Sequence, residues 1–192
     1  MGNKTVKRII LFASGSGTNV ENIISYFRDN AAVDVSLVLS NNPKAGVLKR
    51  VKALKTPFLV FSKADLLGQS LLQRIKSINP DLIVLAGFLL KIPIEFVNAF
   101  PQKIINIHPS LLPKYGGKGM YGDKVHQSVK EAGETETGIT IHLVNEYYDQ
   151  GALIFQTSVA LSPEDSVSDI AQKVHQLEYA HFPEVINKLL FP

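Results

Sequence analysis

The first hundred residues alternate between short, almost wholly apolar runs and longer stretches with helical periodicity, and this alternation constrains the fold more than any other feature. Runs with so few polar residues are typical of strands that are buried on both faces. Strands of this kind that are each followed by a helix form a parallel sheet covered by helices on both sides. The expected strands are 6–13, 33–39, 58–61, 81–86 and 103–108, and the expected helices are 18–30, one from Pro43, 67–78 and 94–100.

The pattern changes after residue 108. A loop rich in proline and glycine precedes a helical stretch, and two strand-like runs with a short acidic loop between them lead to a long last helix. The elements expected here are a helix at 123–132, strands at 137–144 and 152–160, and a helix from Ser166 that Pro183 interrupts. We expect an α/β fold in one domain, residues 1–192: a Rossmann-like, mostly parallel sheet with helices on both faces and a C-terminal antiparallel edge hairpin.

The composition excludes several classes of function. The 192 residues include no cysteine, so disulfides, zinc–thiolate sites and cysteine nucleophiles are excluded, and a reducing cytoplasm is the expected location. The net charge of +3 is mild and no basic stripe is interleaved with aromatic residues, which argues against nucleic acid as a partner. The apolar run at 9–13 is too short to span a membrane, and no cluster of His, Asp and Glu has metal-site spacing.

The most informative chemical motif is Asn106-Ile107-His108, at the end of the strand expected at 103–108. Side chains two residues apart in a strand share a face, so Asn106 and His108 project together while Ile107 points to the other side. An amide N–H can stabilise a negatively charged oxygen, and an imidazole can move a proton. The pair therefore suits acyl-group transfer, and its structural alternative is two polar residues that satisfy backbone groups at a strand end.

A glycine-rich loop, Gly15-Ser16-Gly17-Thr18-Asn19, joins the first strand to the first helix. Glycines allow the backbone to approach a ligand, and the first turn of a helix offers unpaired N–H groups to a phosphate. Val20 stands where a dinucleotide fingerprint needs its third glycine, so the loop indicates a mononucleotide-type phosphate site or, alternatively, a simple tight turn. Thr18 and Glu21 fit a capping box at the start of the helix.

Further polar residues near the two late strands are candidates for the same site. Asp149 lies in the acidic loop, and its carboxylate, placed against His108, would raise the pKa of the imidazole, although such an aspartate is often only a turn residue. Thr140 and His142 share one face of their strand, so His142 would either support the site or face water. The other histidines lie on helical stretches and are expected to be surface or packing residues: His126, His175 and His181.

Four segments together resemble the folate-dependent formyltransferase family in order and spacing, over essentially the whole chain. They are Gly15–Asn19, Leu85–Phe88, Asn106–Pro113 and Asp149–Gly151. The block Asn-x-His-Pro-Ser-Leu-Leu-Pro is highly specific for that family. The glycine loop, and a chain that stops near residue 190 without the extra C-terminal domain of methionyl-tRNA formyltransferases, indicate the members that act on glycinamide ribonucleotide.

The resemblance implies an enzyme that transfers a formyl group from 10-formyltetrahydrofolate to the amine of 5-phosphoribosylglycinamide in purine biosynthesis. It implies catalysis by Asn106, His108 and Asp149, and ribotide binding by Gly17, Thr18, Asn19 and Glu178. It implies folate binding by Leu89, Leu90, Lys91, Ile92 and Asn106, with Lys63 as the candidate for a contact to the folate tail. It also implies a phosphate-binding half (1–100), a catalytic and folate half (101–192), small-molecule partners without a metal, and a monomer or homodimer.

Two departures and two rival functions accompany the resemblance. The loop 114–121 is richer in glycine than is usual in the family, and His175 stands where relatives often have Gln or Lys.

One rival is a formyltransferase acting on another amine, such as an amino sugar nucleotide, which would usually need a nucleotide pocket in extra sequence. The other is a nucleotide- or folate-binding protein without catalytic activity, which the retention of Asn106, His108 and Asp149 disfavours.

Overall fold

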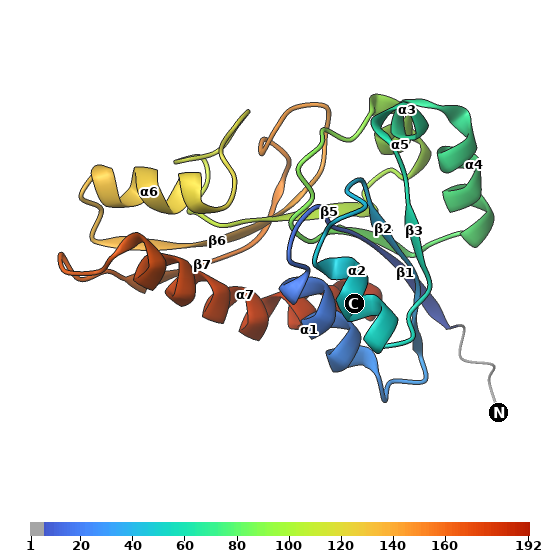
Figure 1. Cartoon of the computed structure of the whole chain (residues 1–192), viewed down its shortest axis with the longest axis horizontal. Helices are drawn as coiled ribbons and strands as arrows, with labels where there is room; N and C mark the ends of the chain where they lie inside the picture. The colour runs from blue at the N-terminus through green and yellow to red at the C-terminus, as the bar shows by residue number, and fades with distance from the viewer. Residues whose placement is uncertain (1–5) are drawn as a thin grey trace.

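The computed structural model describes residues 6–192, which form one seven-stranded sheet with helices on both faces (Figure 1). The strand order is β3-β2-β1-β4-β5-β6-β7. The strands are β1 (Lys7–Phe12), β2 (Val33–Ser40), β3 (Phe58–Val60), β4 (Leu82–Leu85), β5 (Ile104–His108), β6 (Glu136–Leu143) and β7 (Leu153–Ala160). The first five strands pair in parallel, whereas β6 is antiparallel to both β5 and β7. The expected mostly parallel sheet with an antiparallel edge hairpin is confirmed.

The chain spreads across the sheet in two directions from β1. β2 and β3 lie on one side of β1, and β4 and β5 lie on the other. The loops that leave the carboxyl ends of β1 and β4 therefore diverge, and an open α/β sheet binds its ligands in the crevice between such loops. Residues 15–19 follow β1, residues 86–92 follow β4, and β5 ends in His108. Most of the candidate residues thus gather at one edge of the sheet.

The helices form two layers over the sheet (Figure 1). They are α1 (Thr18–Phe27), α2 (Val47–Ala53), α3 (Lys63–Leu67), α4 (Gln69–Ile78), α5 (Ile94–Ala99), α6 (Asp123–Glu131) and α7 (Val167–Leu190). α1, α2 and α7 cover one face, α3, α4 and α5 cover the other, and α6 packs on α7. None of these helices within residues 6–192 is both long enough and apolar enough to cross a membrane.

Strand β1 shows why the apolar runs are nearly continuous. Ile9 and Leu11 enter the core beneath α1 and α7, whereas Ile10 and Phe12 enter the core on the opposite face, and all four are fully buried. A strand that is covered on both faces has no solvent side on which polar residues could alternate. Polar residues are possible only where such a strand ends, and the carboxyl ends of these strands lie at the edge of the sheet that holds the site.

The second and last helices differ from expectation. Pro43 lies in a turn rather than in a helix, because the side chain of Asn42 accepts a hydrogen bond from the Lys44 N–H at 2.9 Å, and α2 begins only at Val47. α7 runs without interruption through Pro183. The residues around this proline are buried in the core, and that packing offsets the backbone hydrogen bond that proline cannot donate.

Two other helix starts also depart from the sequence pattern. The third expected helix, 67–78, corresponds to α4. A short helix that was not expected, α3, precedes it because Ser62 and Asp65 form a capping box, and Gly68, with an extended backbone, separates the two. The capping box expected at Thr18 is absent from α1. The residue before α1 is Gly17, with a φ of 76° and no side chain to cap the helix, so the first N–H groups of α1 are left open.

Candidate active site

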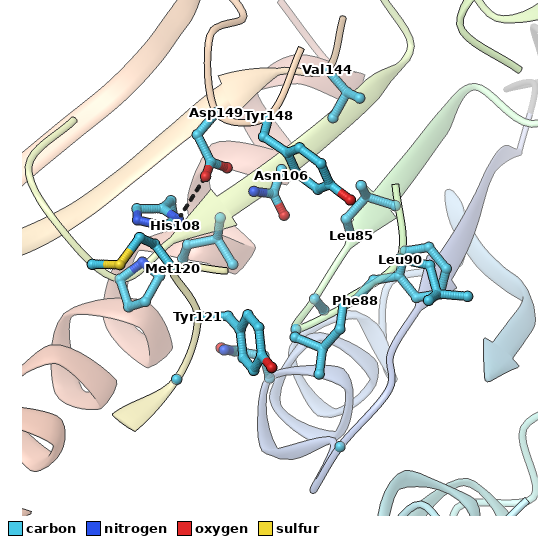
Figure 2. Close-up of a pocket in the computed structure, with 18 of the residues that line it drawn as sticks. Leu85, Phe88, Leu90, Asn106, His108, Met120, Tyr121, Val144, Tyr148 and Asp149 are labelled. Atoms are coloured by element: carbon cyan, nitrogen blue, oxygen red, sulfur yellow. Dashed lines mark ion pairs between the residues drawn. The ribbon is translucent and has the colours of Figure 1, made fainter. Parts of the chain in front are cut away.

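A cavity of about 360 Å³ opens at the carboxyl ends of β1, β4 and β5 (Figure 2). Its wall is formed by the loops that follow these strands, by the loop between β6 and β7, and by parts of α6 and α7. The cavity is lined by the residues that the sequence marks for catalysis, for the ribotide and for the pterin, which are Gly17, Thr18, Asn19, Leu89, Leu90, Lys91, Ile92, Asn106, His108, Asp149 and Glu178. Lys63, the residue expected to meet the folate tail, does not line this cavity.

β5 delivers Asn106 and His108 to the cavity from the same face of the strand, as the alternation predicts (Figure 2). Ile105 and Ile107 pack into the opposite core. His108 is only 3% exposed, and its Nε2 lies 2.8 Å from the backbone oxygen of Tyr115. Because that oxygen can only accept a hydrogen bond, Nε2 carries the hydrogen, and Nδ1 is left to exchange a proton with a ligand.

Asp149 reaches the same place from the loop between β6 and β7, where its backbone has a left-handed φ of 55°. A Cβ on Gly151 would overlap the backbone oxygen of Leu143, so the chain can double back here only because this residue is glycine. The Asp149 carboxylate lies 3.5 Å from Nδ1 of His108 and accepts a hydrogen bond from the Gly117 N–H at 2.8 Å. The structure thus brings together the amide, imidazole and carboxylate that the sequence placed far apart (Figure 2).

Burial decides the charge of this imidazole. It lowers the pKa of His108 below its ordinary value, and the neighbouring Asp149 carboxylate offsets only part of that effect. The expected effect of Asp149 on this pKa is present but smaller than that of burial, and an imidazole with a lowered pKa is neutral at neutral pH. Burial also opposes the charge of Asp149, but contacts with its neighbours, among them the hydrogen bond from the Gly117 N–H, outweigh it, so the pKa of this carboxyl is lowered and the group is ionised.

The glycine loop after β1 is fixed from outside, so that its backbone faces the cavity. Gly17 has a positive φ, and a Cβ at this position would overlap the Val47 side chain. Arg50 donates a hydrogen bond to the Ser16 oxygen at 3.0 Å and pairs with Glu21 at the start of α1. These contacts hold the loop against α2, and the first N–H groups of α1 remain available to an anion.

Asn19 and Glu178 form a buried polar pair beside this loop. Nδ2 of Asn19 donates to a carboxylate oxygen of Glu178 at 2.8 Å, and Glu178 is only 6% exposed. Burial raises the pKa of Glu178, while the bond from Asn19 opposes that rise. The side-chain oxygen of Asn19 is buried without a hydrogen-bond partner among residues 6–192. The pair therefore presents acceptor oxygens to a ligand with hydroxyl groups.

The wall beyond Asn106 is apolar (Figure 2). It is formed by Leu85, Phe88, Leu90 and Val144. Residues 88–93 belong to neither a helix nor a strand, so sheet hydrogen bonds do not occupy their backbone polar groups. Ser14 holds this segment in place, because its Oγ accepts a hydrogen bond from the Leu89 N–H at 2.9 Å and donates to Asn41 at 2.6 Å. A flat heterocycle with polar edges fits a wall of this kind.

Lys63 lies at a second cavity, next to the first. This cavity has a volume of about 590 Å³ and shares residues 89–92, Tyr147 and Tyr148 with the catalytic cavity. Lys63 is thus separated from the catalytic residues and borders only the adjoining space. A ligand that reaches from one cavity into the other would cross the residues that line both, among them Leu90 and Tyr148, to meet it.

The sequence prediction missed His126 as a residue of the site. His126 lies on α6, is only 2% exposed and lines the cavity, so of its two expected roles the surface one is wrong, and the buried ring forms part of the cavity wall. Burial, followed by the effect of nearby His175, lowers the pKa of His126 to about 4. Its Nδ1 has no hydrogen-bond partner among the residues that the structure describes. The buried stripe of Val125 and Val129 is the sequence signal that places His126 beside the inner face of the helix.

Thr140 and His142 share a face of β6, but Thr140 contacts the loop after β5, whereas His142 lines the cavity. The Thr140 hydroxyl donates to the Ser110 oxygen at 2.6 Å and accepts from the Leu112 N–H at 3.0 Å, so it fixes the loop after β5. His142 lines the cavity, where its Nε2 lies 3.2 Å from the amide nitrogen of Asn106. The structure therefore places His142 behind the site, which was one of the two alternatives that the sequence left open.

The fold and the cavity define a class of protein: an α/β protein whose crevice joins a phosphate-type loop to an amide, an imidazole and a carboxylate suited to acyl transfer. A profile described as formyl transferase matches residues 7–186 of this chain. The chain belongs to the formyl transferase family.

Named relatives agree with this assignment. The chain is 37% identical over 190 residues to a chloroplastic phosphoribosylglycinamide formyltransferase of Arabidopsis thaliana, covering 95% of this chain and 65% of that relative. It is 33% identical over 191 residues to phosphoribosylglycinamide formyltransferase of Bacillus subtilis, covering 96% and 95% of the two chains. The crystal structure of glycinamide ribonucleotide transformylase 1 from Geobacillus kaustophilus superposes with a TM-score of 0.87 at 34% identity, covering 96% of this chain and 99% of that one.

Proposed function

We propose that this chain transfers the formyl group of 10-formyltetrahydrofolate to the amine of 5-phosphoribosylglycinamide, a step of purine biosynthesis. The observation that carries the proposal is that a single cavity contains the parts for both substrates and for the chemistry. Asn106, His108 and Asp149 border it together with the glycine loop and Glu178, and with the apolar wall at residues 85–92. The two relatives described above carry the name of an enzyme for the same reaction.

The glycine loop and its neighbours fit the ribotide. The open N–H groups at Gly17, Thr18 and Asn19 offer donors to a phosphate, and the positive end of the α1 dipole favours the negative charge. The buried oxygens of Asn19 and Glu178 are acceptors, so they suit the ribose hydroxyls rather than a second anion. A ribotide bound in this way directs its amine toward Asn106 and His108.

The apolar wall fits the folate. Leu85, Phe88 and Leu90 offer surfaces to a flat pterin ring, and the irregular backbone at 89–92 offers hydrogen-bonding groups to the ring edges. The folate tail would then run into the adjoining cavity, where Lys63 can meet its carboxylates. When bound, the folate supplies the activated formyl carbon, and the protein supplies its orientation, the donor hydrogen bonds and the proton transfer.

Asn106 stabilises the negative charge that develops on the formyl oxygen as the amine attacks. An N–H of the Asn106 amide donates to that oxygen, and one well-placed donor of this kind contributes about 3 kcal/mol to transition-state stabilisation. The site is largely buried, and charge–dipole interactions are stronger there than in water. No side chain needs to form a covalent bond to the substrate, which agrees with the absence of a cysteine and of a serine nucleophile motif.

His108 moves the proton. The resting imidazole is neutral, and its Nδ1 is the nitrogen that is free to accept, since the Tyr115 oxygen engages Nε2. Nδ1 takes the proton that the attacking amine loses as the new C–N bond forms, and it returns this proton to the departing folate nitrogen as the old C–N bond breaks. Asp149, 3.5 Å from Nδ1, stabilises the imidazolium that exists between these two transfers.

The proposal is tested by incubating the purified chain with both substrates and following the absorbance change of the folate. Formation of formylated glycinamide ribotide with the wild-type chain, and its loss with His108→Ala, is the expected result. Turnover with an amino sugar nucleotide but not with the ribotide would support the rival formyltransferase. Binding of either ligand without turnover would support the non-catalytic alternative.

We also propose a division of work between the two halves of the chain. Residues 1–100 supply the phosphate site, and residues 101–192 supply the catalytic residues. The folate site, which the sequence assigned to the second half, takes residues 85–92 of its wall from the first half. A cytoplasmic location, and a monomeric or homodimeric state, remain predictions from the sequence. Fractionation of the native cells and light scattering of the purified chain test them.

A further inference from the structure

His142 occupies a buried position directly behind Asn106. The register of the sheet pairs Asn106 on β5 with His142 on β6, and both side chains point toward the cavity. Nε2 of His142 lies 3.2 Å from the amide nitrogen of Asn106. Nδ1 of the same ring lies 2.8 Å from the backbone oxygen of Leu143. Each ring nitrogen of His142 therefore has its own partner.

These two contacts fix the hydrogens of the ring. The Leu143 oxygen can only accept, so Nδ1 of His142 carries the hydrogen. In a neutral imidazole the other nitrogen is then an acceptor, and the group facing it must be a donor. The amide of Asn106 satisfies this requirement with its NH2 group but not with its oxygen. The tautomer of His142 thus sets which way the amide of Asn106 is turned.

The orientation of Asn106 matters because its amide has two unlike ends. With one N–H donated to His142, the second N–H of the same nitrogen remains for the cavity. A turned-over amide would direct its oxygen toward the developing negative charge, and two negative oxygens repel each other. A catalytic donor acts without reorganisation only if its direction is set before the reaction begins.

We propose that His142 is a positioning residue that orients Asn106, by accepting a hydrogen bond from its amide, so that the amide donates to the formyl oxygen. This inference rests on the proposed formyl transfer for its kinetic consequence, but the hydrogen-bond arrangement exists without substrate. His142 also lies 3.6 Å from the second oxygen of Asp149. A charged His142 that paired with Asp149 would require Asn106 to present its oxygen instead, which is the opposite arrangement.

A double-mutant cycle tests the kinetic part. His142→Phe removes the acceptor, and we expect kcat to fall about tenfold, the effect of losing one hydrogen bond, with the ribotide KM within about twofold of wild type. In the Asn106→Ala background the same substitution should lower kcat by no more than about twofold, because the group that it positions is already gone. Equal losses in both backgrounds would overturn the proposal.

Conservative replacement separates positioning from packing. Gln at position 142 can accept from Asn106 with its oxygen and donate to the Leu143 oxygen with its nitrogen, so His142→Gln should keep kcat within about threefold of wild type. A Gln variant as slow as the Phe variant would contradict the inference. If His142→Phe does not fold, His142→Leu takes its place, and thermal melts of every variant confirm the fold. His181→Gln on α7, outside the cavity, is the control and should leave kcat unchanged.

Nuclear magnetic resonance tests the arrangement without any substrate. With 15N-labelled histidine, the signal that disappears in His142→Gln should show a hydrogen on Nδ1 and none on Nε2 at neutral pH. Hydrogens on both nitrogens, or on Nε2 alone, would overturn the proposal. If the wild-type chain did not formylate the ribotide, the proposed function would fail while this measurement still decided how Asn106 is held.

Discussion

Replacing Asp149 with asparagine removes one negative charge and keeps nearly the same shape. The amide oxygen of the new side chain can still accept the hydrogen bond from the Gly117 N–H, so the loop between β6 and β7 should keep its course. The change leaves His108 without the carboxylate that stabilises its charged form. Asp149→Asn therefore isolates the electrostatic contribution of this residue from its structural one.

The expected magnitude follows from the distance of 3.5 Å between the carboxylate and Nδ1 of His108. At an effective dielectric constant of about 20, two unit charges so close attract by about 5 kcal/mol. Both side chains are largely buried, so solvent screens this attraction little. Reorganisation in the variant recovers part of it, and we expect kcat to fall between about 100-fold and about 1000-fold, or about 3–4 kcal/mol.

The pH profile gives the sign of the effect. In the wild type, protonation of His108 in the free enzyme removes the base, so log kcat/KM should fall at acid pH. The carboxylate raises the pKa of His108 against the effect of burial, so its loss in Asp149→Asn should lower that pKa further and move the acid limb to lower pH.

Steady-state rates from the folate absorbance, measured from about pH 5 to about pH 9, check both effects. Asp34→Asn removes a carboxylate from the exposed part of β2 and serves as the matched control, with rates equal to wild type. A kcat for Asp149→Asn within tenfold of wild type, or an acid limb that moves to higher pH, would refute the role given to Asp149.

Three other outcomes are expected. Gly17→Val places a side chain against Val47 at a positive φ, so it should raise the ribotide Kd in calorimetry at least tenfold and lower the thermal midpoint; an unchanged Kd would contradict the phosphate-site role. Burial raises the pKa of Glu178, so the folded state holds its proton more tightly than the unfolded state, and stability is lost as pH rises from about 4.5; denaturant unfolding of Glu178→Gln should show less of that loss. The pKa of His126 is lowered to about 4, so stability is lost as pH falls from about 6.5 to about 4, by up to about 3 kcal/mol, and His126→Leu should flatten the unfolding free energy over that range.

The sequence predicted the strands closely because burial on both faces leaves short, nearly continuous apolar runs with turn residues at their ends. β2, for example, was expected at 33–39 and runs from Val33 to Ser40. The helix starts were less predictable, since short-range side-chain contacts such as that of Asn42 decide them, and several polar residues compete for each cap. The predicted interruption at Pro183 was wrong for a different reason: the tertiary packing of α7 outweighs the tendency of proline to break a helix.

The site was predictable to the extent that it depends on neighbours in sequence. Strand alternation alone placed Asn106 and His108 on one face. Asp149 was placed by the family resemblance, because its approach depends on a backbone reversal at Gly151 that no local pattern reveals. The direction of the His108 pKa could not be read from the sequence either, since it depends on how deeply the ring is buried. His126 was missed because Val125 and Val129 mark the buried face of α6, but the sequence does not show that this face, packed on α7, borders the cavity.

Activity requires the correct register between the antiparallel strands β5 and β6. The recovery of activity during refolding therefore reports when this register forms. A slip of one residue between these strands would place Ile141, not His142, opposite Asn106 and would turn the polar face away from the crevice. Such a chain would keep its apolar content and most of its secondary structure. Recovery of formyl transfer after dilution from denaturant should therefore lag behind the recovery of the far-ultraviolet circular dichroism signal, and the lag reports the time that β5 and β6 need to reach their correct register.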